Sequence, residues 1–197
     1  MEQPIQANGD DGENKLSALE SQIRENYGKV VYSHKVHEKC ADANLRKLKR
    51  IKLTQIVLSA ITAGSLLATL FGNNQAGTIV AVILSTALLT LNTYTKDYDL
   101  GAVAQKHVET ATRLWNIRES FLSLLTDLSE GYISIEEARI KRDELQEALA
   151  SFYLNAPRTN AKAFAESQKA LKINEELTFS DDEIDKFLPK PLRRAKQ

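Results

Sequence analysis

The residues best suited to chemistry in this chain are two histidines and the single cysteine, spaced as His34-x-x-His37-x-x-Cys40. Imidazole nitrogen and thiolate sulfur are ligands that zinc prefers, and His34 and His37 lie one turn apart on a helix. The spacing carries Cys40 away from His34, however, and no second cluster in the sequence completes four ligands. We therefore expect ordinary, partly buried helix residues here and no bound metal.

Clustered acidic residues have a structural explanation. Ser134-Ile-Glu-Glu137 and Ser180-Asp-Asp-Glu183 are capping-box patterns, and carboxylates are favoured in the first turn of a helix. The sequence holds no Ser-His-Asp set, no glycine loop that could cradle a phosphate and no pair of carboxylates in an apolar setting. We expect neither enzymatic activity nor a cofactor.

The main feature of the rest of the chain is a long segment, residues 53–95, that carries no charged side chain. A short polar break, Gly72-Asn73-Asn74-Gln75, divides it into spans 53–72 and 76–95. Each span reaches about 30 Å as a helix, the thickness of the hydrocarbon core of a bilayer. The sequence predicts a transmembrane helical hairpin. The alternative is a hairpin buried in a soluble bundle, but soluble helices of this length normally expose a charged face.

Basic residues flank the hairpin on one side only. Five of them precede the first span: Arg46, Lys47, Lys49, Arg50 and Lys52. Lys96 follows the second span. The positive-inside rule then predicts a multi-pass protein with both termini in the cytoplasm. The cluster is expected to contact lipid headgroups, or alternatively to form an anion site, for example for a signalling nucleotide.

Two side-chain stripes run along the spans. The polar residues of the first span fall within an arc of about 140° and include the candidate pore-lining hydroxyls Ser59, Thr62, Ser65 and Thr69. Small residues spaced by four predict close helix packing: Ala60, Gly64 and Ala68 in the first span and Gly77, Ala81 and Ser85 in the second. The hydroxyls can hydrogen-bond between packed helices or, around an axis of several copies, line a water path.

The rest of the chain predicts an all-α protein. It has only eight glycines and four prolines, and its 26 basic and 26 acidic residues cancel, which argues against a nucleic-acid-binding protein. We expect the following organisation: a disordered lead over 1–14, a cytoplasmic amphipathic helix over 15–52, cytoplasmic helices over 96–155, and short helices with a basic tail over 156–197. The spans should extend into the cytoplasmic helices, with one long helix ending near Ser129 before Gly131.

The complete pattern resembles a known family. A helix with a basic end at 46–52 leads to the charge-free hairpin, the second span ends in Asn92-Thr-Tyr-Thr-Lys96, and a long helix holds His107 to Trp115 (HVETATRLW) before the Ile133-Ser-Ile-Glu-Glu137 turn. These features, over roughly residues 15–155, are similar to the SLATT domain, the SMODS and SLOG-associating two-transmembrane effector.

The resemblance implies a bacterial anti-phage effector of the inner membrane. Such proteins are thought to assemble as homo-oligomers and form pores or disrupt the bilayer, which halts the infected cell. The implied partners are a sensor module, such as a cyclic-oligonucleotide synthase or a reverse transcriptase, or a nucleotide second messenger. The alternative left open is a non-conducting anchor that recruits a cytoplasmic partner.

Overall fold

The computed structural model describes residues 9–72, 75–190 and 193, and this part of the chain is all-helical without a strand, which confirms the predicted fold class. Six helices follow in order: α1 (Gly9–Gly72), α2 (Gln75–Asp97), α3 (Leu100–Ser129), α4 (Ile135–Asn155), α5 (Ala161–Lys172) and α6 (Asp181–Phe187). The predicted polar turn at 73–74 lies outside the described residues.

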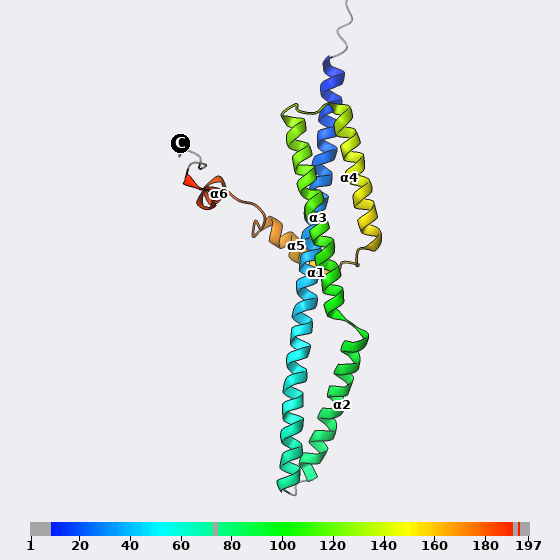
Figure 1. Cartoon of the computed structure of the whole chain (residues 1–197), viewed down its shortest axis with the longest axis vertical. Coiled ribbons are helices and arrows are strands. Elements are labelled where there is room, and N and C mark those ends of the chain that lie inside the picture. Colours follow the sequence, from blue (N-terminus) through cyan, green and yellow to red (C-terminus); the bar gives the residue numbers. More distant parts are fainter. Residues whose placement is uncertain (1–8, 73–74, 191–192, 194–197) are drawn as a thin grey trace, which may run out of the picture.

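Helix α1 is the axis of the molecule (Figure 1). Its 64 residues form one unbroken helix, about 96 Å long, which passes through Gly28 without a break. It begins at Gly9, so residues 9–14 are helical and do not belong to the disordered lead predicted over 1–14. Residues 1–8 lie outside the described part.

The second span does not run straight into the next helix. Helix α2 ends at Asp97, and α3 begins at Leu100 with Asp99 as its N-cap, whose carboxylate accepts a hydrogen bond from the Ala102 amide at 2.9 Å. Figure 1 shows the resulting offset between α2 and α3. The two spans therefore leave the hairpin differently, because only α1 is continuous.

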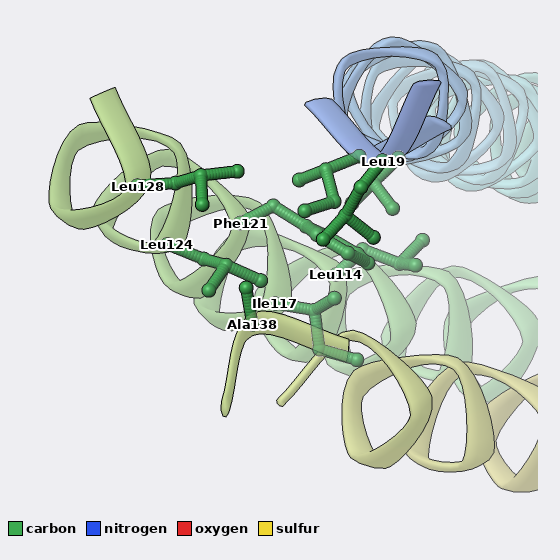
Figure 2. Close-up of a cluster of buried hydrophobic side chains, with 9 residues drawn as sticks. Leu19, Leu114, Ile117, Phe121, Leu124, Leu128 and Ala138 are labelled. Atoms are coloured by element: carbon green, nitrogen blue, oxygen red, sulfur yellow. The ribbon is translucent and has the colours of Figure 1, made fainter. Parts of the chain in front are cut away.

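A hydrophobic core joins the N-terminal half of α1 to α3 and α4, and we call this part the helical bundle (Figure 2). Leu114 and Phe121 of α3 are completely buried between Ile23 of α1 and Ala138 of α4. Each large apolar side chain buried in this way contributes about 1.5–3 kcal/mol. The core fixes the orientation of α1 against α3, and hence the base of the hairpin.

The turns end the helices where the sequence predicts. Gly131 has a φ of +71°, a left-handed conformation that glycine adopts at little cost, directly after α3. Ser134 and Ser180 each form a complete capping box, at the starts of α4 and α6. Helix α5, which lies within the segment 156–197 where short helices are expected, is capped by Asn160.

The last two helices are held differently. Helix α5 packs on the middle of α1, where Ala163 meets Val36 and Cys40 and the ring of Phe164 lies 6.3 Å from that of Tyr32. Helix α6, by contrast, projects away from the rest (Figure 1). Between α5 and α6, Glu176 forms ion pairs with Lys35 and Lys39 of α1.

Candidate functional site

The hairpin of α1 and α2 presents an exposed apolar surface. In the most apolar window of each candidate span, 0% of the residues in α1 and 6% of those in the second span are buried. Leu70 and Phe71, near the far end, are 78% and 88% exposed. The alternative of a hairpin buried inside a soluble bundle is therefore wrong for this chain, and the exposed surface suits lipid.

The two helices meet along a narrow seam. Half-buried or buried side chains recur at alternating intervals of four and three residues, which is the spacing of knobs-into-holes packing. In α1 they are Ile51, Gln55, Leu58, Thr62, Ser65 and Thr69, and in α2 they are Gly77, Ala81, Leu84, Leu88 and Leu91. The faces on either side of this seam are exposed.

The candidate pore-lining hydroxyls divide between seam and surface. Thr62, Ser65 and Thr69 are half-buried in the seam, whereas Ser59 is exposed. All four donate to the carbonyl four residues earlier on their own helix, at 2.7 to 2.9 Å. These bonds satisfy the hydroxyl protons inside the hairpin and leave oxygen lone pairs as acceptors.

The candidate packing residues also divide between the seam and the exposed surface of the hairpin. A Cβ at Gly77 would lie 2.7 Å from Oγ1 of Thr69, and Ala81 is buried, so these two small residues bring α2 close to α1. Ser85 is exposed, as are Ala60, Gly64 and Ala68 of α1. A Cβ at Gly64 would meet nothing within 4 Å. The small residues of α1 thus form an open face, which we call the small-residue face.

Polar side chains join the helices at the end of the hairpin nearest the bundle. Gln55 donates to Oδ1 of Asn92 at 2.9 Å, and the Lys47 ammonium donates to the Tyr94 hydroxyl at 2.7 Å while it lies 5.2 Å from the ring centroid. Tyr94 in turn stacks on Tyr98, with the centroids 5.0 Å apart. The Gln55–Asn92 and Lys47–Tyr94 pairs join residues 37 and 47 positions apart, so the spacing of nearby residues does not predict them.

The members of the basic cluster differ in their contacts. Arg46 lies 3.8 Å from Asp42 and 3.9 Å from Glu166, and Lys47 is held by Tyr94. The remaining members, Lys49, Arg50 and Lys52, are exposed. They surround α1 at the position where an anionic headgroup layer would meet the hairpin.

The three residues of the histidine–cysteine motif are buried, and each has a different neighbour. Nδ1 of His37 lies 3.0 Å from Nδ1 of His107 in α3, the ring of His34 packs 5.4 Å from that of Trp115, and Sγ of Cys40 lies 3.8 Å from the Asn160 amide. Among the described residues, no group of three or more possible ligands gathers around one point. The motif residues therefore pack against α3 and α5.

The histidine pair is held neutral. Burial is the main cause that lowers the pKa of His37 to about 4, helped by the positive potential of His107 and His34, and burial also lowers the pKa of His107. With both rings neutral, one Nδ1 donates its proton and the other accepts it. Sequence reasoning missed this pair, because His107 lies seventy positions from His37.

A cleft of about 570 Å³ opens beside His34, between α1, α3 and the chain after α5. Glu176 reaches into it and pairs with Lys35 at 2.7 Å and Lys39 at 3.3 Å. The hydrogen bond from Lys35 is the main cause that lowers the pKa of Glu176 to about 2. Burial opposes the charged form of Lys35, yet its hydrogen bonds to Glu176 and Glu38 raise its pKa.

The backbone that carries Glu176 is strained. Glu175 and Leu177, on either side of it, have φ angles of 52° and 74°. A left-handed conformation costs a residue with a side chain about 1–2 kcal/mol. In the same turn, the Glu176 amide donates to the Ala170 carbonyl at 2.9 Å and the Thr178 amide donates to the Glu175 carbonyl at 3.0 Å.

Comparison with known proteins agrees with this architecture. The model of the SMODS and SLOG-associating 2TM effector domain family 4 matches residues 19–183, which include both spans, the bundle and α5. No curated protein and no solved structure matches the chain. The match extends past residue 155, where the resemblance seen in the sequence ends, and it includes Glu176. Since it covers most of the chain, the protein belongs to the SMODS and SLOG-associating 2TM effector domain family 4.

Proposed function

We propose that this protein is the membrane effector of a bacterial anti-phage system, and that its copies assemble and permeabilise the inner membrane when a sensor module reports infection. Membership of a two-transmembrane effector family supports a role at the membrane. The observation that carries the proposal is the hairpin itself, whose spans are charge-free and almost wholly exposed in the single chain. An effector built in this way acts on the bilayer or within it.

The small-residue face supports assembly between copies. Ala60, Gly64 and Ala68 lie away from α2 and leave the α1 backbone open to a neighbour. Membrane helices associate through such faces, because close backbone contact replaces the hydrophobic driving force that lipid removes. A homo-oligomer through α1 would leave the seam of each hairpin intact.

A water path requires a change in the hairpin. Thr62, Ser65 and Thr69 face α2 in this structure, so a pore lined by them and by Ser59 forms only when α2 moves away from α1. Their oxygen lone pairs could then accept hydrogen bonds from water. The closed hairpin is in this proposal the resting state, and the Gln55–Asn92 bond helps to hold it.

The proposed topology places both termini in the cytoplasm. The basic cluster from Arg46 to Lys52 and Lys96 lie at the bundle end of the hairpin, in agreement with the positive-inside rule. Cysteine substitutions on a background without Cys40 test this orientation in spheroplasts. The cysteine of Asp182→Cys should be protected from an impermeant thiol reagent until the membrane is opened. Labelling of intact spheroplasts would contradict the proposed orientation.

Ion and dye flux from liposomes that contain the purified protein tests permeabilisation. We expect flux to rise steeply with the protein-to-lipid ratio, because several copies must meet. Thr62→Val removes a hydroxyl of the seam with little change in shape and should reduce flux without loss of cross-linked oligomer. Thr90→Val, on the exposed face of α2, is the matched control and should leave flux unchanged.

The second candidate is a non-conducting anchor that recruits a partner to the membrane. It is favoured by the closed hairpin, in which the hydroxyls of α1 are satisfied by their own backbone. Reconstituted protein that gives no flux at any density, although it is inserted and oligomeric, supports the anchor. Flux that is lost in Thr62→Val and kept in Thr90→Val supports the pore.

A further inference from the structure

The cleft between α1 and α3 has the size and the walls of a ligand site. Its volume of about 570 Å³ lies within the range of about 300–1,000 Å³ that is usual for small-molecule pockets. Charged and aromatic side chains line it together, among them Lys35, Lys39, Glu38, Trp115 and Glu176. Neither the proposed pore nor the small-residue face uses any of these residues.

Two ammonium groups converge on one carboxylate in this cleft. Lys35 and Lys39 lie one turn apart on α1, and both approach Oε2 of Glu176, at 2.7 and 3.3 Å. The Lys35 side chain is only 10% exposed, which strengthens its interaction with an anion. Charge-assisted hydrogen bonds of this kind hold carboxylate and phosphate oxygens equally well.

Glu176 can leave this position without leaving Lys35 uncompensated. Glu38 also accepts from Lys35, at 3.0 Å, whereas the described partner of Lys39 is Glu176. The cleft would then hold one ammonium group that requires a new anion.

The opposite wall offers an aromatic surface. The indole of Trp115 lines the cleft and is 39% exposed, with the Arg118 guanidinium 4.4 Å from its ring centroid. The His34 ring also lies 5.4 Å from the indole, so a ligand ring would pack against its remaining exposed part, offset or edge-to-face, as aromatic pairs prefer. An anion on the lysines and a ring on Trp115 would fill the two sides of the cleft.

Lipid headgroups are not the source of this anion. Lys39 lies about 21 Å along α1 from Leu53, where the span begins, which is beyond the reach of the headgroup layer. The ligand is therefore a soluble molecule. We propose that this cleft binds a compact anion, phosphate or carboxylate, joined to a flat ring, and that Glu176 occupies the anion position until such a ligand displaces it.

The single tryptophan of the chain makes the site directly measurable. The full-length protein in detergent is titrated with phenyl phosphate at constant ionic strength while the fluorescence of Trp115 is followed. We expect weak binding by the wild type and a Kd at least tenfold lower for Glu176→Gln, which no longer competes for the lysines. Inorganic phosphate lacks the ring and should bind Glu176→Gln more weakly than phenyl phosphate does.

Further variants assign the effect to the cleft. Asp182→Asn removes a carboxylate from α6, away from the cleft, and should keep the wild-type affinity. Lys39→Met, added to Glu176→Gln, should abolish the gain in affinity for phenyl phosphate. If circular dichroism shows that Glu176→Gln unfolds, Glu176→Asp withdraws the carboxylate by one methylene group and should shift Kd in the same direction.

Clear results would overturn the proposal. One is that Trp115 of a folded Glu176 variant gives no saturable response to phenyl phosphate or to benzoate. A second is that wild type and Glu176 variant bind with equal affinity. A third is that the Glu176 variant still binds after Lys39→Met is added. Saturation by phenyl phosphate alone identifies a phosphate site, and saturation by benzoate alone a carboxylate site. The binding is measured in detergent, so its outcome does not depend on whether the protein forms a pore.

Discussion

Gly77 of α2 lies so close to Thr69 of α1 that a Cβ at position 77 would stand 2.7 Å from the Thr69 hydroxyl oxygen and 3.2 Å from the Ser65 carbonyl oxygen. A Cβ at Gly64, five residues before Thr69 and on the exposed face of α1, would meet nothing within 4 Å. The two glycines therefore serve different interfaces, one within the hairpin and one open to another helix.

Matched leucine substitutions should separate these two interfaces. Gly77→Leu forces a side chain into a filled seam, and we expect it to destabilise the hairpin by about 1–3 kcal/mol, seen as a lower thermal midpoint in detergent. Gly64→Leu should leave that midpoint unchanged and reduce cross-linking between copies. Unaltered cross-linking and flux in Gly64→Leu would contradict the role of the small-residue face.

The bond between Gln55 and Asn92 should hold the bundle end of the hairpin closed. Its length of 2.9 Å predicts a coupling energy of about 0.6 kcal/mol, the average for hydrogen bonds between membrane helices, and at most about 1.7 kcal/mol. A double-mutant cycle with Gln55→Leu and Asn92→Leu measures this energy from the unfolding midpoints. If the bond restrains opening, Gln55→Leu should also increase flux at a fixed protein-to-lipid ratio.

The stability of the bundle should fall with pH below about 6.5. The pKa of His37 is about 4 in the folded protein, against an ordinary value of 6.5. Between pH 6.5 and pH 4, His37 is therefore protonated in the unfolded chain and neutral in the folded protein. Stability is therefore full above pH 6.5 and is lost as pH falls towards 4, by at most about 3 kcal/mol from this residue. His107 and His34, whose pKa values are also lowered, act in the same direction.

Thermal unfolding between pH 7.5 and 4 measures this dependence. In His37→Gln, which cannot titrate, the fall in the midpoint should be smaller than in the wild type. Glu176 does not account for the change near pH 6, because its pKa of about 2 confines its contribution to lower pH, between its ordinary value of 4.5 and about 2. An identical pH dependence in His37→Gln would rule out the histidine pair as its source.

Two leucines of α3 test the hydrophobic core. Leu114 is fully buried between α1 and α4, whereas Leu122 is 42% exposed on the same helix. Leu114→Ala should cost about 2–5 kcal/mol, because it leaves a cavity. Leu122→Ala should cost much less, and chemical denaturation of both variants in detergent gives the comparison. Equal losses would show that α3 is packed on both faces.

Much of the fold could be predicted from local patterns. The capping boxes at Ser134 and Ser180 and the glycine at 131 act within a few residues, so their positions in the sequence give the helix ends. The break at Asp99 was not predicted, because the apolar pattern continues on both sides of it. The start of α1 was also misplaced, since a polar and acidic segment can extend a helix that is anchored further along.

The pore-lining and packing roles of the span residues stay predictions, and the structure adds how these residues are arranged. Helical periodicity places Thr62, Ser65 and Thr69 on one face of α1, but periodicity does not indicate which face of α1 meets α2. The close approach at Gly77 and the bond from Gln55 to Asn92 decide this. The hydroxyls can lie in the seam because their protons are already bonded to their own backbone.

By itself, the sequence determined the class of this protein: an all-helical chain with two uncharged spans, flanked by basic residues at one end. These properties depend on the transfer of side chains between water and lipid and on hydrogen bonds within single helices, which are local. Only the tertiary structure decided that His37 meets His107, that Glu176 reaches Lys35, and that the small-residue face of α1 points outward. Each of these depends on how distant helices rotate and pack against one another, and such contacts have no signature in the spacing of nearby residues.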